Sequence, residues 1–388
     1  MRRIRLSERP DWRERAREVG FGFHEMYGEP YWADDVAYLF TIDQIENDIE
    51  DPTAELHEMC MDFAGDAVAS EETLTRLLVP AEHHDLVASS WAEDRHVYGR
   101  FDLAYDGSGP ARMLEYNADT PTGVFETAFF QHDWLIARTE RGDLPSDADQ
   151  FNLVQESLIE ALGTFDHGAG APIFHFACDV GNDEERGTTT YLMDCAVQAG
   201  HRVEMIDIRR IGIDPEGRFT DESDRVIDRC FKLYPWEDMM ADRFGAHLRP
   251  GVFVEPAWKA VLSTKALLPL LWERHAGHPN LLPAWFEADV PANAGDVVLK
   301  PVHGREGENV TIRSGGETVA QTEGTRPDEP RVAQALAPLF EADGVHAVLG
   351  SWVVGDRACG LAVREDTGRI TRDLSRFVPH AIVGSNEY

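Results

Sequence analysis

The spacing of apolar residues divides the first 170 residues into helical segments and one hairpin. Apolar positions recur at helical spacing from Ile42 to Asp66, and an amphipathic segment begins at Glu14, so residues 1–80 are predicted to be mostly helical. Residues 97–117 instead alternate as two strands around a glycine-rich turn at 107–110. Two further helices are predicted at residues 123–140 and 147–163.

A different organisation begins near residue 171. Residues 172–178 form a short apolar run typical of a buried strand. A helix is predicted from Asp183 to Ala199, with Gly200 ending it, and residues 202–208 read as the next strand. The order strand, helix, strand predicts a parallel, Rossmann-like layer.

The last part of the chain is predicted to mix strands with interrupted helices. The expected elements are a hairpin with Gly217 in its turn and 226–234 as its second arm, helices within 255–285, a strand at 297–300, a surface loop at 322–330, and a strand pair within 345–364 turned at Gly355 and Asp356. The fold class is therefore α/β (α+β). Three regions are predicted: 1–170, 171–254 and 255–388.

Composition describes a globular protein of 388 residues, 43% of them hydrophobic and 27% charged. No apolar run approaches the roughly 20 residues of a membrane span. The polar N-terminus does not resemble a secretory signal. Five dispersed cysteines without a Cys-x-x-Cys pair favour reduced thiols, and hence a cytoplasmic protein.

The net charge of −34 argues against nucleic acid and anionic membranes as partners, because both repel an acidic surface. Two interpretations of this charge stay open. It is either a solvated acidic surface, from a salt-rich or arginine-favouring source, or it attracts a cationic substrate such as a polyamine. Composition does not separate the two.

The hairpin carries the first candidate chemistry. With a four-residue turn, Asp102 faces Glu115 and Arg100 faces Asn117. Side chains directly opposite each other lie about 5 Å apart at Cβ, so the two carboxylates repel unless a cation lies between them. Hard oxygen ligands of this kind suit Mg²⁺. The alternative is a set of ordinary polar residues on a solvated face.

The loop from Asn117 to Gly123 is rich in side-chain oxygens and leads into a predicted helix. Thr122 is placed to cap that helix. A helix N-terminus also binds anions, so the loop is a candidate site for a substrate carboxylate. Both interpretations stay open.

The chain uses lysine only four times, and two of the four suggest a phosphate site. Lys300 ends a predicted strand, directly before a turn that contains Gly304 and Gly307. Glycines let backbone N–H groups approach an anion. The turn is not a Walker A loop, because no Gly-Lys-Ser/Thr follows. Together with Lys265 upstream and Arg364 on a later strand, it favours nucleotide binding over a purely structural turn.

Three separate segments form a recognisable set: Leu114 to Thr122, Lys300 to Gly307 and Ser375 to His380. Together they resemble the glutathionylspermidine synthase family, in its synthetase half with an ATP-grasp fold. Two more segments, Gly28 to Trp32 and Phe231 to Glu237, resemble the stand-alone bacterial branch.

The resemblance implies a reaction in which ATP phosphorylates a carboxylate and an amine then attacks the acyl phosphate to give an amide. By the family pattern, Arg100 and Arg364 stabilise the transferring phosphoryl group. Asp102, Glu115 and Asn117 hold Mg²⁺. Lys265 and Lys300 bind ATP phosphates beneath the loop of Gly304, Arg305, Glu306 and Gly307, and Thr120 lies near the substrate carboxyl.

Amine recognition is expected at carboxylates. Glu185 follows a predicted parallel strand, where ligands commonly bind, and Glu237 lies in a family-like segment. The alternatives are an acidic helix start and a surface residue.

The chain departs from the two-headed members of the family, since its first family motif begins at Gly28. No amidase domain or amidase activity is expected, and Cys60 is interpreted as a core cysteine. The substrates stay open: glutathione or another peptide carboxylate, with a polyamine or another amine. A non-catalytic ATP-binding protein is the alternative, although the complete set of charged residues argues against it.

Overall fold

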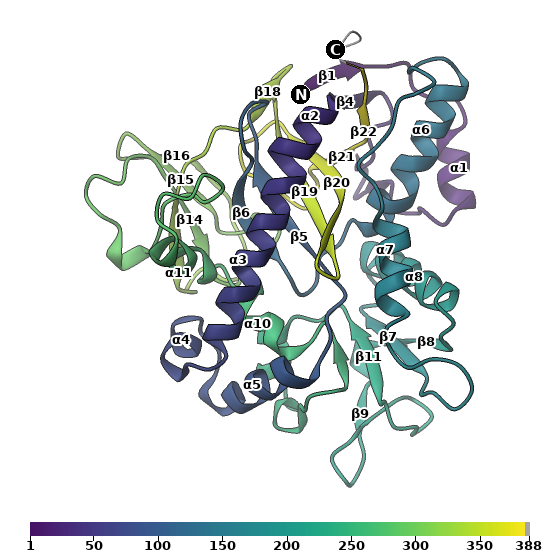
Figure 1. The fold of residues 1–388 in the computed structure, drawn as a ribbon, viewed down its shortest axis with the longest axis vertical. Coiled ribbons are helices and arrows are strands. Elements are labelled where there is room, and N and C mark those ends of the chain that lie inside the picture. Colours follow the sequence, from purple (N-terminus) through teal and green to yellow (C-terminus); the bar gives the residue numbers. More distant parts are fainter. Residues whose placement is uncertain (385–388) are drawn as a thin grey trace.

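A six-stranded sheet at the centre of the fold brings together segments far apart in the sequence (Figure 1). The computed structural model describes residues 1–384. The strand order is β21-β20-β19-β5-β6, with β18 beside β19. These strands are β5 (Tyr98–Ala104), β6 (Arg112–Asn117), β18 (Phe340–Ala342), β19 (Val345–Val354), β20 (Arg357–Asp366) and β21 (Arg376–Val378). Both predicted strand pairs, 97–117 and 345–364, are confirmed, and they lie side by side in this sheet.

A long helical segment crosses one face of the sheet (Figure 1). It consists of α2 (Ile42–Ile45), a π-helical turn η1 (Glu46–Glu50) and α3 (Asp51–Ala67). Thr41 and Gln44 form a capping box that begins the helix. The π turn directly precedes Pro52, which has no N–H to donate to a regular helical bond. The prediction of a helix from Ile42 to Asp66 is confirmed.

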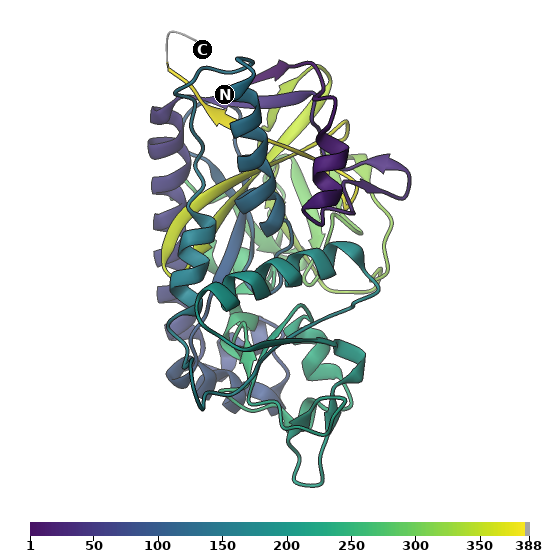
Figure 2. The ribbon, with the colours of Figure 1, turned by 90° about the vertical axis from the view of Figure 1, so that its right-hand side faces the viewer.

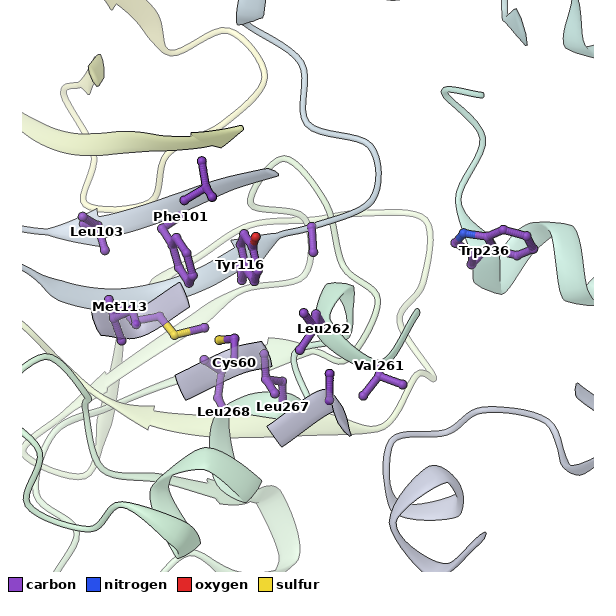
Figure 3. Close-up of a cluster of buried hydrophobic side chains, with 14 of the residues drawn as sticks. Cys60, Phe101, Leu103, Met113, Tyr116, Trp236, Val261, Leu262, Leu267 and Leu268 are labelled. Atoms are coloured by element: carbon purple, nitrogen blue, oxygen red, sulfur yellow. The ribbon is translucent and has the colours of Figure 1, made fainter. Parts of the chain in front are cut away.

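The face of the sheet beneath α3 is apolar (Figure 3). Phe101 and Tyr116 stack with their ring centroids 3.8 Å apart, and Cys60 of α3 lies buried among the neighbouring side chains. Since successive strand residues point to opposite faces, burial of Phe101 and Tyr116 here turns their sequence neighbours to the other face. That other face carries the charged residues of the hairpin.

A parallel sheet forms the Rossmann-like layer at the lower end of the molecule, in both views (Figures 1 and 2). Its order is β12 (Phe253–Val254), β11 (Arg229–Lys232), β7 (Phe174–Cys178) and β8 (Val203–Asp207), all parallel. Helix α8 (Asp183–Gln198) links β7 to β8, as predicted, with Asn182 capping its start.

One prediction in this layer is wrong. Residues 226–234 do not form the second arm of a hairpin: β11 pairs with β7 and β12, and the short hairpin around Gly217 is closed by β9 (Gly212–Ile213) and β10 (Phe219–Thr220). Cys230, Phe231 and Lys232 are consecutive buried residues, which is the pattern of a strand covered on both faces.

A five-stranded sheet beside the central one carries Lys300. Its order is β13 (Ala284–Phe286), β17 (Arg331–Ala335), β14 (Val297–Pro301), β15 (Thr311–Ser314) and β16 (Glu317–Gln321). Only β14 was predicted. The helices expected in 255–285 are the short turn η6 (Ala257–Lys259), α10 (Ala260–Ser263) and α11 (Leu267–Arg274).

The N-terminal region is less helical than predicted, because β1 (Arg2–Arg5) and β4 (Val36–Phe40) form a separate three-stranded sheet with β22 (His380–Ile382) (Figure 1). All five residues of β4 are buried, so helical and strand spacing cannot be distinguished there. The remaining helices of four or more residues are α1 (Trp12–Glu18), α4 (Glu71–Arg76), α5 (His84–Glu93), η3 (Glu126–Phe130), α6 (Gln131–Glu140), α7 (Val154–Leu162) and α9 (Trp236–Ala241). The helix expected at 147–163 begins only at Val154.

The structure bears on two expectations from composition, the reduced cysteines and the lack of a membrane span. All five cysteines are buried and unpaired. Within residues 1–384, no helix is both long and apolar enough to cross a membrane. The division into 1–170, 171–254 and 255–388 stays a prediction.

Candidate functional site

The hairpin β5–β6 has the predicted register from Arg100 to Asp102, shifts by one residue nearer the turn, and gathers polar groups on one face. Asp102 pairs with Glu115, and Arg100 pairs with Asn117. Arg100 Nε lies 2.6 Å from Asp102 Oδ1. The Asn117 amide donates to Asp102 Oδ2 (3.1 Å) and Glu115 Oε1 (3.3 Å). Two carboxylates and one amide therefore converge at one point of the sheet.

Lys265 and Lys300 approach this hairpin from two other elements. Lys265 Nζ lies 2.7 Å from Glu115 Oε2 and 2.5 Å from the carbonyl oxygen of Gly304. Lys300 Nζ donates to the carbonyl oxygen of Leu114 (2.9 Å) and to Gln334 Oε1 (2.8 Å). Leu114 lies at the bulge where the hairpin register shifts, and residues at such bulges lack ladder partners, so its carbonyl is available to Lys300.

The ionisation of these groups is coupled. Burial opposes the charge on Glu115, but Lys265 and Lys300 outweigh it, so the pKa of this carboxyl is lowered. Burial lowers the pKa of the Lys300 ammonium to about 8, even though Glu115 favours the charged form. Lys300 is thus a cation that an incoming anion would further stabilise.

A cavity of about 400 Å³ opens above Lys265, Lys300 and the hairpin. Its charged lining includes Asp102 and Glu115 beside the two lysines. Its apolar lining includes Val298, Val310, Ile312, Leu336 and Leu339. A cavity that combines apolar side chains with lysine cations suits the base and the phosphates of a nucleotide.

The glycine-bearing loop forms part of this cavity's wall, through Gly304, Glu306 and Gly307. Gly307 has φ +69°, and a Cβ at this position would lie 2.2 Å from the carbonyl oxygen of Thr371. Only glycine permits this backbone conformation and this close approach together. The loop is therefore packed against residues 370–371, which also line the cavity.

A smaller cavity of about 160 Å³ adjoins the first. The residues that line both cavities are Asp102, Glu115, Glu306, Gly307, Val348 and Thr371. Arg100, Thr120 and Arg364 line the smaller cavity but not the larger one. The hairpin carboxylates therefore lie at the junction, with the lysines on one side and the arginines on the other.

Two of the arginines that line the smaller cavity, Arg100 and Arg364, donate to backbone carbonyls. Arg100 Nη1 donates to the carbonyl oxygen of Thr122 (2.7 Å). Arg364 donates through Nε to Ser375 (2.8 Å) and through Nη2 to Arg372 (3.0 Å) and Asp373 (2.8 Å). The carbonyl partners of Arg364 are neutral, and its positive charge interacts with the nearby carboxylates of Glu184, Glu306 and Asp373.

Arg305 lies at the smaller cavity, although it was expected at the phosphates. Its Nη1 donates to Thr120 Oγ1 (2.8 Å), and its Nη2 lies 2.5 Å from Glu237 Oε1. Glu237 thus contacts Arg305, and the two residues link the glycine loop to α9 and to the loop that carries Thr120.

Beneath this contact lies a buried ion pair between Asp119 and Lys232. Asp119 also accepts from the backbone N–H of Trp236 (3.0 Å). The loop after the hairpin is therefore fixed to the parallel layer at the residue before Thr120.

Three carboxylates face Arg364 in the smaller cavity. Burial raises the pKa of Glu184 and of Asp373. Burial, followed by the neighbouring charges of Asp373 and Glu184, raises the pKa of Glu306 to about 7. A bound cation would relieve this mutual repulsion.

Glu185, predicted as an amine ligand, is not brought to this cavity. Its carboxylate accepts from the backbone N–H of Asp179 (2.9 Å). Its neighbour Glu184 lines the cavity instead. The sequence marked the acidic run 183–185 but not which member faces inward, because that depends on the direction of α8.

The hairpin triad of Asp102, Glu115 and Asn117 fits Mg²⁺ by its donor chemistry. Two carboxylates and an amide oxygen are hard ligands, and Mg²⁺ usually takes one or two carboxylates plus phosphate oxygens. The amide of Asn117 presents its nitrogen here, and turning it over would present Oδ1 to an ion. Arg100 pairs with Asp102, and Lys265 pairs with Glu115.

Other site residues were missed because they depend on tertiary contacts. Gln334 fixes Lys300, and Tyr31 packs beneath Arg364, whose guanidinium carbon lies 5.3 Å from the ring centroid. Neither residue has a sequence signal of its own beyond Tyr31's place in the family-like segment at 28–32.

Sequence relatives match most of the chain. A protein of Haemophilus influenzae (strain ATCC 51907 / DSM 11121 / KW20 / Rd) named "Putative acid--amine ligase" is 38% identical over 391 residues, 97% of this chain and 98% of that protein. The bifunctional glutathionylspermidine synthetase/amidase of Escherichia coli (strain K12) is 26% identical, over 96% of this chain. Trypanothione synthetase of Crithidia fasciculata is 28% identical, over 82% of this chain. The matches span 63% and 52% of the latter two proteins.

Solved structures show the same fold. A glutathione synthetase-like effector (GSS30) from Globodera pallida, in its apo form, superposes with a TM-score of 0.58 at 13% identity, covering 89% of this chain and 88% of that chain. The mixed α/β class and the ATP-grasp fold expected from the motifs are confirmed. The family described as glutathionylspermidine synthase preATP-grasp matches residues 3–383, and this chain belongs to that family.

Proposed function

We propose that the protein is an ATP-dependent ligase that joins a carboxylate to an amine through an acyl phosphate. The observation that carries the proposal is the junction of two cavities at Asp102 and Glu115. A nucleotide in the larger cavity would direct its terminal phosphate toward this junction. A carboxylate in the smaller one would meet it from the side of Arg100 and Arg364.

In the first step, a carboxylate oxygen attacks the γ-phosphorus of ATP, giving an acyl phosphate and ADP. Negative charge spreads over the transferring oxygens, so positioned cations stabilise the transition state. Lys265 and Lys300 hold the nucleotide phosphates, and Arg100 and Arg364 hold the oxygens that arrive on the acceptor side. Asp102, Glu115 and Asn117 would hold Mg²⁺, which would supply positive charge to the phosphates.

The acceptor carboxylate is placed by Thr120 and Arg305. The Thr120 hydroxyl and the Arg305 guanidinium are 2.8 Å apart, and both are donors suited to a carboxylate. An ion pair with Glu237 fixes the position of the Arg305 guanidinium. Arg305 therefore has its proposed role on the acceptor side, while the backbone of Gly304 to Gly307 covers the nucleotide.

In the second step, the amine nitrogen attacks the acyl carbon, phosphate leaves, and the nitrogen loses a proton. The attacking amine must be neutral, whereas amines in water are mostly protonated. Glu184, Glu306 and Asp373 are placed to attract the ammonium form, and a carboxylate with a raised pKa is suited to accept its proton. Glu306, with a pKa of about 7, is the strongest candidate.

The proposed substrates are a peptide-like carboxylate, of which glutathione is one example, and a polyamine or another amine. This proposal follows the names of the relatives together with the acidic lining of the smaller cavity. Amidase activity is not part of the proposal, since the site described here contains no nucleophilic cysteine, and all five cysteines of the chain are buried.

A matrix of carboxylates and amines, assayed for ADP and phosphate with ATP and Mg²⁺, tests the proposal. ADP formation that needs both a carboxylate and an amine, with an amide detected by mass spectrometry, is the expected result. ATP binding without ADP formation for every pair would instead support a non-catalytic ATP-binding protein.

A further inference from the structure

Two histidines and an aspartate converge on the outer side of the central sheet, away from both cavities. His57 lies on α3, His96 directly precedes the β5 hairpin, and Asp356 lies in the turn between β19 and β20. The Nε2 atoms of His57 and His96 lie 3.1 Å and 3.2 Å from the same oxygen, Asp356 Oδ1. All three ligand atoms fall within 4.8 Å of one another.

We propose that His57, His96 and Asp356 bind a divalent transition-metal ion of the Zn²⁺ class, with water as the fourth ligand. Zn²⁺ accepts imidazole nitrogen and carboxylate oxygen at about 2.0–2.2 Å in a tetrahedron, which places neighbouring ligand atoms roughly 3.3 Å apart. The two nitrogen–oxygen distances in this group are close to that value. Each histidine nitrogen therefore already has the spacing from the carboxylate oxygen that the ion requires.

The surroundings suit an ion of this kind. The side chain of Asp356 is 76% exposed, which gives an ion and a water ligand access to the group, whereas the two histidines are held by packing. The ring of His96 packs edge-on against Trp258, with centroids 5.4 Å apart. The nearby cation Lys259 is neutralised by Glu255 at 3.2 Å.

The second ring nitrogen of His57 has the partner that a metal ligand needs. His57 Nδ1 lies 3.3 Å from the hydroxyl oxygen of Tyr116. With Nε2 on an ion, Nδ1 carries the hydrogen and donates it to this oxygen, which fixes the orientation of the ring. Tyr116 belongs to β6, so the ion would tie α3, the start of β5 and the β19–β20 turn to the hairpin that carries Glu115 and Asn117.

This group differs from the oxygen triad of the hairpin in its metal preference. Imidazole ligands favour Zn²⁺ and its neighbours, whereas Mg²⁺ prefers oxygen alone.

A second histidine-containing group, His175 with Glu204 and Asp221, is a weaker candidate. Arg225 already pairs there with both carboxylates, at 2.5 Å and 2.6 Å.

The test is Zn²⁺ binding to the purified full chain. Excess Mg²⁺ is present so that the oxygen triad of the hairpin is occupied by Mg²⁺. The variants are Asp356→Asn and His96→Gln, and the control is Asp289→Asn, which removes an exposed carboxylate from a turn elsewhere. Equilibrium dialysis with metal analysis gives stoichiometry and affinity. Co²⁺ in place of Zn²⁺ adds a visible absorption band whose intensity reports tetrahedral coordination. Circular dichroism establishes that each variant is folded.

We expect the wild type and Asp289→Asn each to bind one Zn²⁺ per chain and to melt at a higher temperature with Zn²⁺. The affinity for Zn²⁺ should be at least about tenfold weaker in both test variants, since even the loss of a supporting contact costs that much. If zinc bound instead at the group of His175, the Asp356→Asn protein would bind it as well as the wild type does. No zinc binding by the wild type at micromolar concentration, or equal binding by all four proteins, would overturn the proposal.

Discussion

Replacement of Lys300 by methionine removes the buried cation of the larger cavity while keeping a side chain of similar length. In the structure, Lys300 Nζ has two neutral partners, Leu114 O and Gln334 Oε1, and the ammonium is partly offset by Glu115. A hydrogen bond to a charged group contributes about 1.5–3 kcal/mol. Loss of one such contact to a phosphate therefore predicts ATP binding weaker by about 10- to 150-fold, at about 1.4 kcal/mol per tenfold.

Calorimetric titration of the Lys300→Met protein with ATP and Mg²⁺ measures this change directly. The control is Arg331→Met, which removes a cation from the neighbouring strand β17, where Arg331 pairs with Glu287 outside both cavities. Thermal melting separates lost affinity from lost stability, since Gln334 is left without its charged partner. Affinity within about twofold of the wild type in a folded Lys300→Met protein, or equal losses in both variants, would refute the assignment of Lys300 to the phosphates.

Three further outcomes are expected. Glu115→Gln should abolish phosphate release at limiting Mg²⁺, because an amide is a weaker ligand and the ion pair with Lys265 is lost; normal turnover across a Mg²⁺ titration would contradict this. The affinity of the free protein for ATP should fall toward tenfold per pH unit above pH 8, since burial lowers the pKa of Lys300 to about 8 and ATP requires its charged form; affinity that stays flat from pH 7 to 9.5 would exclude this role. Lys232→Met should lower the free energy of unfolding in urea by about 3–5 kcal/mol, because it leaves Asp119 buried without its cation, and a loss below about 1 kcal/mol would argue against a charged pair.

The hairpin is the part of the site that could be predicted from sequence alone. A four-residue turn at 107–110 predicted Asp102 opposite Glu115, and this pairing is confirmed, although Leu103 and Ala104, nearer the turn, pair one residue out of that register. The bulge after Asp102 was not predictable, because the pattern at 112–117 is compatible with a regular ladder. Yet this bulge is what makes the carbonyl of Leu114 available to Lys300.

Other parts of the fold depend on contacts that a sequence pattern does not carry. The residues of β11 are buried on both faces, so their periodicity did not separate a hairpin arm from a central parallel strand. Arg305 was assigned to the phosphates because it lies in a glycine-bearing loop, and its contacts with Thr120 and Glu237 arise only when three distant segments meet. The choice of Glu184 over Glu185 likewise depends on how α8 is turned against the cavity.

Transfer of an oxygen atom from substrate to phosphate tests the central claim most directly. When a carboxylate identified in the substrate matrix is labelled with ¹⁸O and turned over with ATP and the amine, one labelled oxygen must leave in the phosphate if an acyl phosphate forms. Mass spectrometry of the phosphate should find one ¹⁸O per turnover, and Lys300→Met should slow its appearance without changing the label. Amide formation with unlabelled phosphate would contradict the acyl-phosphate route.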